Sequence, residues 1–115
     1  PFAGLSVKVK TGIMRIPFAR LAVLEVKSGH LYFYSSDGSV REVSATLQDY
    51  EGKLLAQPEF IKTHRSYIVN LEQMSDLTPT DFITRSGSVV PISRLLYIGV
   101  RRAYMEHLFT EAGVR

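Results

Sequence analysis

Apolar and polar residues alternate along most of the chain. In LSVKVK, residues 5–10, leucine and valine alternate with serine and lysine, a period of two that is typical of a strand with one buried face. Similar short runs are IMRIP, LAVLEV, LYFYS, SVREVS, SYIVN, MSDL, FITRS and SVVPIS, separated by turn-forming segments such as TG, SGH, SSDG and TPTD. The pattern predicts a meander of short antiparallel strands, in which Pro91 confines the last strand to an edge or an end.

Two segments have helical spacing instead. In residues 46–58 leucine and tyrosine recur at the spacing of one helix face, and Thr46 can cap the helix together with Asp49 three residues later. A C-terminal helix is expected to begin after Ser93, which is a natural N-cap. Its apolar stripe would consist of Leu96, Val100, Tyr104 and Leu108. The predicted fold class is therefore mainly β, with small antiparallel sheets, one short amphipathic helix and a C-terminal helix.

Composition places the chain among folded domains. It has 115 residues, 45% of them hydrophobic and 22% charged, which is enough for one core and typical of a globular protein. Cysteine is absent, which excludes disulfides and thiolate zinc sites and agrees with a cytoplasmic location. No apolar run reaches the length of about 20 residues that a membrane span requires. We expect one domain over residues 1–115, without a cofactor.

The first residue is Pro1, where an initiator methionine would stand. We therefore expect the chain to be a piece of a longer protein, with a further domain upstream.

Charge directs attention to one short segment. The formal net charge is +3, which permits a polyanionic partner without requiring one. The segment FIKTHRSYIVN, residues 60–70, places Lys62, His64 and Arg65 between two apolar stretches. Apolar anchors on both sides would hold a short basic turn rigidly away from the core, which is a suitable shape for entering a groove.

This turn belongs to a larger pattern. THRSYIVNL is followed, after strand-like runs, by GSVVPISR, and it is preceded by a helical segment and by IPFARLAVLEVKSGHLYFYSSDGSVREV. In this order the chain resembles the LytTR family of bacterial DNA-binding output domains, over about residues 15–100. The histidine-arginine turn followed by proline-x-serine-arginine carries most of the resemblance.

The resemblance implies an elongated stack of small sheets that reads double-stranded DNA with loops inserted in successive major grooves. By position, the base-reading residues would be His30, Arg65 and Arg94, with Lys62 and His64 as supporting backbone contacts. An arginine fork can bond guanine O6 and N7 together, whereas lysine near phosphate adds affinity without sequence choice. Ser93 as N-cap would place Arg94 in the first helical turn, where backbone N–H groups can face a phosphate.

The family also suggests partners. Repeated DNA half-sites, an upstream receiver domain and a homodimer on DNA are expected from the resemblance. One position departs from the family pattern, because Leu95 stands where many members have a second basic residue.

Other interpretations remain open at this stage. His30 and His64 could each be structural, and Arg94 could be an exposed helix residue. The main alternative function is a β-rich protein-interaction or ligand-sensing module without DNA binding. An enzyme is not expected, because the three histidines are scattered without the spacing of a metal site or a catalytic triad.

Overall fold

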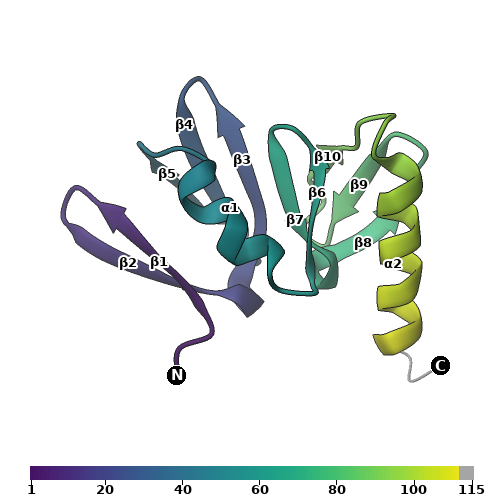
Figure 1. Cartoon of the computed structure of the whole chain (residues 1–115), viewed down its shortest axis with the longest axis horizontal. Helices are drawn as coiled ribbons and strands as arrows, with labels where there is room; N and C mark the ends of the chain where they lie inside the picture. Colours follow the sequence, from purple (N-terminus) through teal and green to yellow (C-terminus); the bar gives the residue numbers. More distant parts are fainter. Residues whose placement is uncertain (112–115) are drawn as a thin grey trace.

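Antiparallel strands dominate the computed structural model, which describes residues 1–111 (Figure 1). The β1–β2 hairpin stands apart from a five-stranded sheet of order β5-β4-β3-β7-β6 and a three-stranded sheet of order β10-β9-β8. The strands are β1 (Gly4–Val9), β2 (Gly12–Pro17), β3 (Leu21–Lys27), β4 (His30–Ser35), β5 (Val40–Val43), β6 (Phe60–His64), β7 (Tyr67–Asn70), β8 (Met74–Leu77), β9 (Asp81–Thr84) and β10 (Val89–Pro91). The other elements are the helices α1 (Gln48–Leu55) and α2 (Tyr97–Glu111) and the single 3₁₀ turns η1 (Phe18–Arg20) and η2 (Leu71–Gln73).

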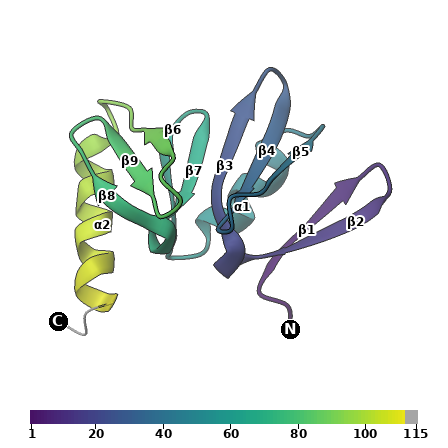
Figure 2. The same cartoon turned by 180° about the vertical axis from the view of Figure 1, so that it is seen from behind.

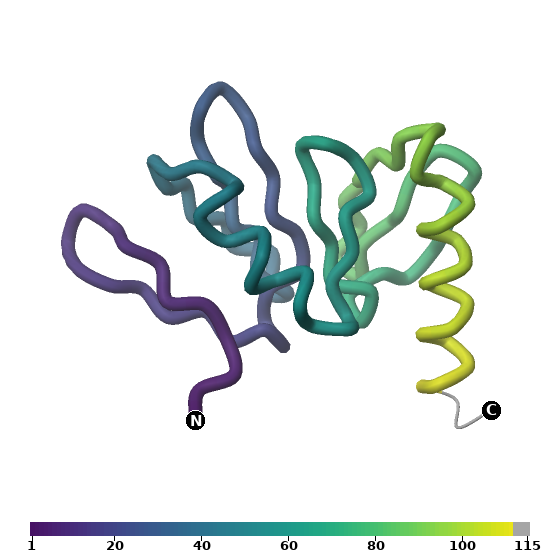
Figure 3. Tube along the Cα trace, viewed as in Figure 1, coloured from purple at the N-terminus to yellow at the C-terminus, as the bar shows by residue number. Residues whose placement is uncertain are grey.

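The predicted fold class is confirmed. The sheets stack along the long axis of a molecule that measures 44 × 33 × 25 Å, as the Cα trace shows (Figure 3). β1 follows its predicted alternation, with Leu5 and Val7 buried and Ser6 and Lys8 exposed. β10 is an edge strand that ends at Pro91, as expected for a residue that lacks an N–H donor.

Two apolar clusters cover opposite faces of the five-stranded sheet. β3 alternates between them: Leu24 belongs to the cluster shared with α1 and the β1–β2 hairpin, and Val23 to the cluster shared with the three-stranded sheet and α2. The two views show the helices and hairpins on either side of this sheet (Figures 1 and 2). A strand buried on both faces explains why LAVL is continuously apolar instead of alternating.

A buried asparagine joins distant parts of the chain. Asn70, with an exposed fraction of 0%, donates from Nδ2 to the carbonyl oxygens of Phe18 at 3.1 Å and Leu21 at 3.0 Å. Its Oδ1 accepts the N–H of Glu72 at 3.0 Å. The side chain therefore caps η2, in line with a backbone-capping role for this residue, and also fixes the entry into β3.

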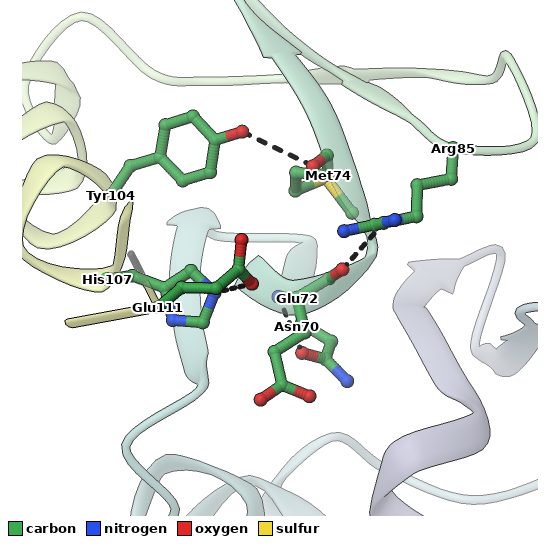
Figure 4. Close-up of polar contacts among 7 residues, drawn as sticks. All are labelled: Asn70, Glu72, Met74, Arg85, Tyr104, His107 and Glu111. Atoms are coloured by element: carbon green, nitrogen blue, oxygen red, sulfur yellow. Dashed lines mark hydrogen bonds and ion pairs between the residues drawn. The ribbon is translucent and has the colours of Figure 1, made fainter. Parts of the chain in front are cut away.

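The C-terminal helix docks on the three-stranded sheet. Tyr104 stacks edge to face on Phe82 with ring centroids 5.1 Å apart, and its hydroxyl donates to the Met74 carbonyl at 3.2 Å (Figure 4). Val100 and Tyr104 are buried, whereas Leu96 and Leu108 are exposed. The predicted apolar stripe is thus correct at its two central positions only.

Both predicted helix caps differ from the structure. The Asp49 carboxylate accepts the Thr46 N–H at 3.2 Å, but the residue before α1 is Leu47, without a side-chain cap. α2 begins at Tyr97, so the prediction that Ser93 is its N-cap is wrong. Ser93 begins a turn that precedes α2, because the N–H groups of Leu96 and Tyr97 donate to carbonyls three residues back and the first bond over four residues runs from Val100 to Leu96. No helix among residues 1–111 is long and apolar enough to cross a membrane.

Candidate nucleic-acid interface

Several connections lie along one long edge of the molecule. The turns β3–β4 and β6–β7 and the β10–α2 connection are at the top of Figure 1, and the β1–β2 turn points toward the same side. The start of the chain and the end of α2 lie at the opposite edge. Of the sequence-predicted residues, Arg65 and Arg94 lie in these connections, and His30 is the first residue of β4, directly after the β3–β4 turn. The fold therefore brings the three predicted base-reading positions to one edge.

The β6–β7 turn is closed by its own histidine. Nδ1 of His64 accepts the Ser66 N–H at 3.1 Å, and the His64 ring packs edge to face on Tyr67 at 5.8 Å. Because Nδ1 is an acceptor, the ring proton is on Nε2. Arg65 is exposed at the apex. His64 thus has the structural role that the sequence left open, and its Nε2–H is the group left to meet a ligand.

Main-chain hydrogen bonds join the three connections side by side. The Val26 N–H donates to the Ser66 carbonyl at 2.8 Å, and the Ser93 N–H donates to the Thr63 carbonyl at 2.8 Å. The hydroxyl of Thr63, a fully buried residue, also donates to the Pro91 carbonyl at 3.1 Å. Each connection is therefore attached to its neighbour within a few residues of its exposed tip.

A tight turn carries Arg94. The Leu96 N–H donates to the Ser93 carbonyl at 3.1 Å and lies 3.3 Å from the Ser93 hydroxyl oxygen. This i to i+3 bond defines a β-turn whose central residues are Arg94 and Leu95. Arg94 therefore precedes α2, and the expected first helical turn around it is wrong.

His30 is held by an acidic neighbour. Its Nδ1 lies 2.9 Å from Oε2 of Glu42, and both side chains are about half exposed, at 42% and 52%. The preceding Ser28 and Gly29 have φ of 52° and 76°, as a type I′ hairpin turn requires. The carboxylate requires the hydrogen on Nδ1, which orients Nε2 away from Glu42.

Lys62 is already paired. Its ammonium group bonds the Glu51 carboxylate of α1, with both side chains about one-third exposed. Among residues 1–111, Arg65 and Arg94 have no such carboxylate partner. The two arginines therefore present free guanidinium groups, whereas Lys62 must exchange a carboxylate for any other anion.

Hydrogen bonds from two tyrosines to the Glu25 carboxylate hold the start of β7, next to the β6–β7 turn. Glu25 accepts the hydroxyls of Tyr67 at 2.6 Å and of Tyr34 at 2.7 Å. Burial, followed by the hydrogen bond to Glu25, raises the pKa of Tyr67 to about 12. The same causes raise the pKa of Tyr34. Both hydroxyls stay protonated at neutral pH and keep Tyr67 beside His64.

A basic groove continues the edge beyond His30. It has a volume of about 500 Å³ between the β1–β2 hairpin and β5. Its lining includes the cations Lys8, Lys10 and Arg41, the carboxylate of Glu42 and the imidazole of His30. Cations outnumber the single carboxylate, so the groove can accept an anion. Over the described part of the chain, no group of three or more histidine and acidic side chains could hold a metal ion.

Sequence reasoning missed the supports of this site. Glu25, Tyr67 and Thr63 looked like ordinary strand residues, and only the pairing of β3 with β7 brings Glu25 opposite Tyr67. The pairing of His30 with Glu42 follows from the register of β4 and β5, which the SSDG turn alone does not determine. Arg65 and Arg94 are thus exposed on neighbouring connections that are hydrogen-bonded to each other through β6, an arrangement that suits contact with a polyanion.

Comparison with known proteins agrees. Residues 11–105 match the LytTr DNA-binding domain family, and the chain belongs to this family. It is 30% identical over 95 residues to the sensory transduction protein LytT of Bacillus subtilis (strain 168). The aligned segment covers 78% of this chain and 39% of that protein. The chain thus spans about two fifths of the length of this relative.

A solved structure has the same fold. The LytTr DNA-binding domain of a methyl-accepting/DNA response regulator from Bacillus cereus superimposes with a TM-score of 0.69 at 26% identity, covering 91% of this chain and 98% of that one. The family resemblance inferred from the basic turn and the PISR segment is confirmed. The matching family is a DNA-binding domain, not a catalytic one.

Proposed function

We propose that this domain reads specific double-stranded DNA sequences with three connections, inserted in successive major grooves on one face of the duplex. The observation that carries the proposal is the chain of main-chain bonds, Val26 to Ser66 and Ser93 to Thr63, which holds the connections at fixed separations. The 44 Å long axis exceeds one helical repeat of DNA, about 34 Å. An edge of this length can reach two grooves without unfolding a loop.

Arg65 and Arg94 are the main base-reading residues in this proposal. Both are exposed at turn apices, and a guanidinium fork can bond guanine O6 and N7 together. His30 reads a third position through Nε2, since Nδ1 is turned to Glu42.

The supporting residues position the domain on the backbone. His64 presents Nε2–H beside Arg65, and Lys62 reaches phosphate when it leaves Glu51. Ser93 acts through the turn that presents Arg94 and not as a helix cap. These contacts strengthen binding to every sequence alike.

The wider assembly is part of the proposal. The domain spans residues 1–115 and is the output half of a cytoplasmic transcriptional regulator. An upstream receiver domain controls it, and two copies occupy repeated half-sites. The similarity to a sensory transduction protein and to a response-regulator domain supports this arrangement.

Selection of bound duplexes from a random DNA pool tests the function. We expect the wild-type domain to enrich a short motif, and Arg65→Ala to lose preference at one base position, by about 1–3 kcal/mol. Lys62→Ala should weaken all sequences equally. Arg20→Ala is the charge-matched control, because Arg20 is exposed in η1, outside the three connections.

Two outcomes would contradict the proposal. A motif that is unchanged by Arg65→Ala and Arg94→Ala together would remove these turns from recognition. Binding that does not weaken with salt would exclude phosphate contacts and would favour a protein-interaction module.

A further inference from the structure

Leu95 is the most exposed large apolar residue of the described chain. Its exposed fraction is 94%, against 62% for Val89 and 69% for Ile13. A leucine fully in water loses roughly the whole free energy that burial would provide. Exposure alone does not assign a role, because single apolar residues are common on protein surfaces; the position of Leu95 next to Arg94 in the same turn is what makes it a candidate for contact with a ligand of this edge.

The turn geometry ties Leu95 to Arg94. Both are central residues of the β-turn closed by the Leu96 N–H and the Ser93 carbonyl. Central residues of a β-turn form its apex. The turn is also attached to β6 by the hydrogen bond from the Ser93 N–H to the Thr63 carbonyl, so a ligand that contacts this apex meets both residues side by side. If Arg94 enters a major groove, Leu95 enters with it.

The major groove offers one methyl group to such a side chain. Guanine, adenine and cytosine edges present polar acceptors and donors, whereas thymine presents its C5-methyl group. Placed against a polar edge, the leucine would strip water from groups that it cannot bond. Against a thymine methyl, both partners lose apolar surface to water.

We propose that Leu95 is a specificity-determining residue that selects thymine, by contact with its C5-methyl group, beside the base read by Arg94. This inference rests on the proposed function and adds a base preference to it. A single methyl contact changes affinity by about fourfold, which is less than an arginine fork provides but enough to appear in a selected motif.

Deoxyuridine substitution tests the contact directly, because deoxyuridine pairs like thymidine and lacks only the C5-methyl group. Each thymine of the duplex enriched by the wild-type domain is replaced in turn, and the dissociation constant is measured by titration. We expect one replacement to weaken wild-type binding by about fourfold and to have no effect on Leu95→Ala. Val89→Ala is the matched control, since Val89 is an exposed apolar residue on β10 outside the turn, and it should keep the wild-type response.

The failures of the two proposals are distinguishable. Suppose that Arg94→Ala loses a base preference. If no deoxyuridine replacement then weakens wild-type binding, or if one replacement weakens the binding of wild type and of Leu95→Ala equally, only the leucine contact is overturned. If Arg94→Ala leaves the motif unchanged, the turn does not read DNA and both proposals fail at this position. Thermal unfolding of Leu95→Ala checks that the exposed substitution leaves the fold intact.

Discussion

The backbone N–H of Ser93 donates to the carbonyl oxygen of Thr63 at 2.8 Å, so the turn that bears Arg94 is attached to the strand that leads to Arg65. The Thr63 hydroxyl adds a second attachment, to the carbonyl of Pro91 at 3.1 Å. A residue without contact to solvent therefore sets the separation between two exposed arginines.

Thr63→Val should loosen this attachment without changing the shape of the strand. The valine keeps the backbone bond to Ser93 but leaves the Pro91 carbonyl without its donor, at a cost of about 1 kcal/mol in the free energy of unfolding. DNA selection should show weaker preference at the base assigned to Arg94 and unchanged preference at the base assigned to Arg65. The control Thr110→Val, at an exposed position near the end of α2, should change neither base preference. Equal losses of preference at both bases in Thr63→Val would refute a local role for Thr63.

Glu51→Gln should strengthen DNA binding. The substitution removes the carboxylate that holds the Lys62 ammonium, which frees this cation for a phosphate. We expect tighter binding at low salt and a slope of log affinity against log salt that steepens by about 0.9. In the Lys62→Ala background the same substitution should lose this effect, and Glu106→Gln, on the exposed face of α2, provides a charge-matched control.

Asn70→Ala should destabilise the fold strongly. It leaves the carbonyls of Phe18 and Leu21 and the N–H of Glu72 without their side-chain partner. Unsatisfied buried groups cost about 1–3 kcal/mol each, so urea unfolding should show a loss of about 3 kcal/mol or more. Asn70→Asp keeps the acceptor for Glu72 but places a carboxylate against two carbonyls, and it should be at least as damaging; a smaller loss for the aspartate would contradict this hydrogen-bond assignment.

Stability should fall at high pH through Tyr67. Its pKa is raised from 10.0 to about 12 in the folded protein, so the folded state retains the proton more tightly than the unfolded state. Its contribution to the free energy of unfolding is fully present below pH 10 and is lost as pH rises toward 12. Denaturant unfolding across this range should show a smaller decline for Tyr67→Phe than for wild type.

Local periodicity was sufficient for the elements of this fold. Alternation in residues 5–10 placed Leu5 and Val7 inside, and Pro91 marked an edge strand, because both depend on neighbours in the sequence. A serine such as Ser93 suits a helix cap and a turn equally well, and here it begins a turn with its N–H bonded to Thr63, thirty residues earlier. A capping residue and a turn residue look alike when the distant partner is unknown.

The candidate site likewise has residues that the sequence could indicate and supporting contacts that it could not. Arg65 lies in the turn between β6 and β7 and Arg94 in the connection from β10 to α2, and the family resemblance carried by the THRS and PISR segments predicts both as base-reading residues. The pairing of Lys62 with Glu51, and of Glu25 with Tyr34 and Tyr67, depends on how α1 and the strands lie together. Long-range register and helix docking decide these contacts, and neither has a signature in a short stretch of residues.

The β3–β4, β6–β7 and β10–α2 connections are attached to one another mainly through backbone atoms, as in the bond from the Val26 N–H to the Ser66 carbonyl. Their exposed side chains therefore contribute little to the spacing of the tips. In the proposed binding mode, substitutions at Arg65, Arg94 or Leu95 should change the preferred base while the distance between contacted bases stays the same. In that binding mode the preferred sequence and the spacing of the contacts would be set by different parts of the chain, the first by exposed side chains and the second by the backbone.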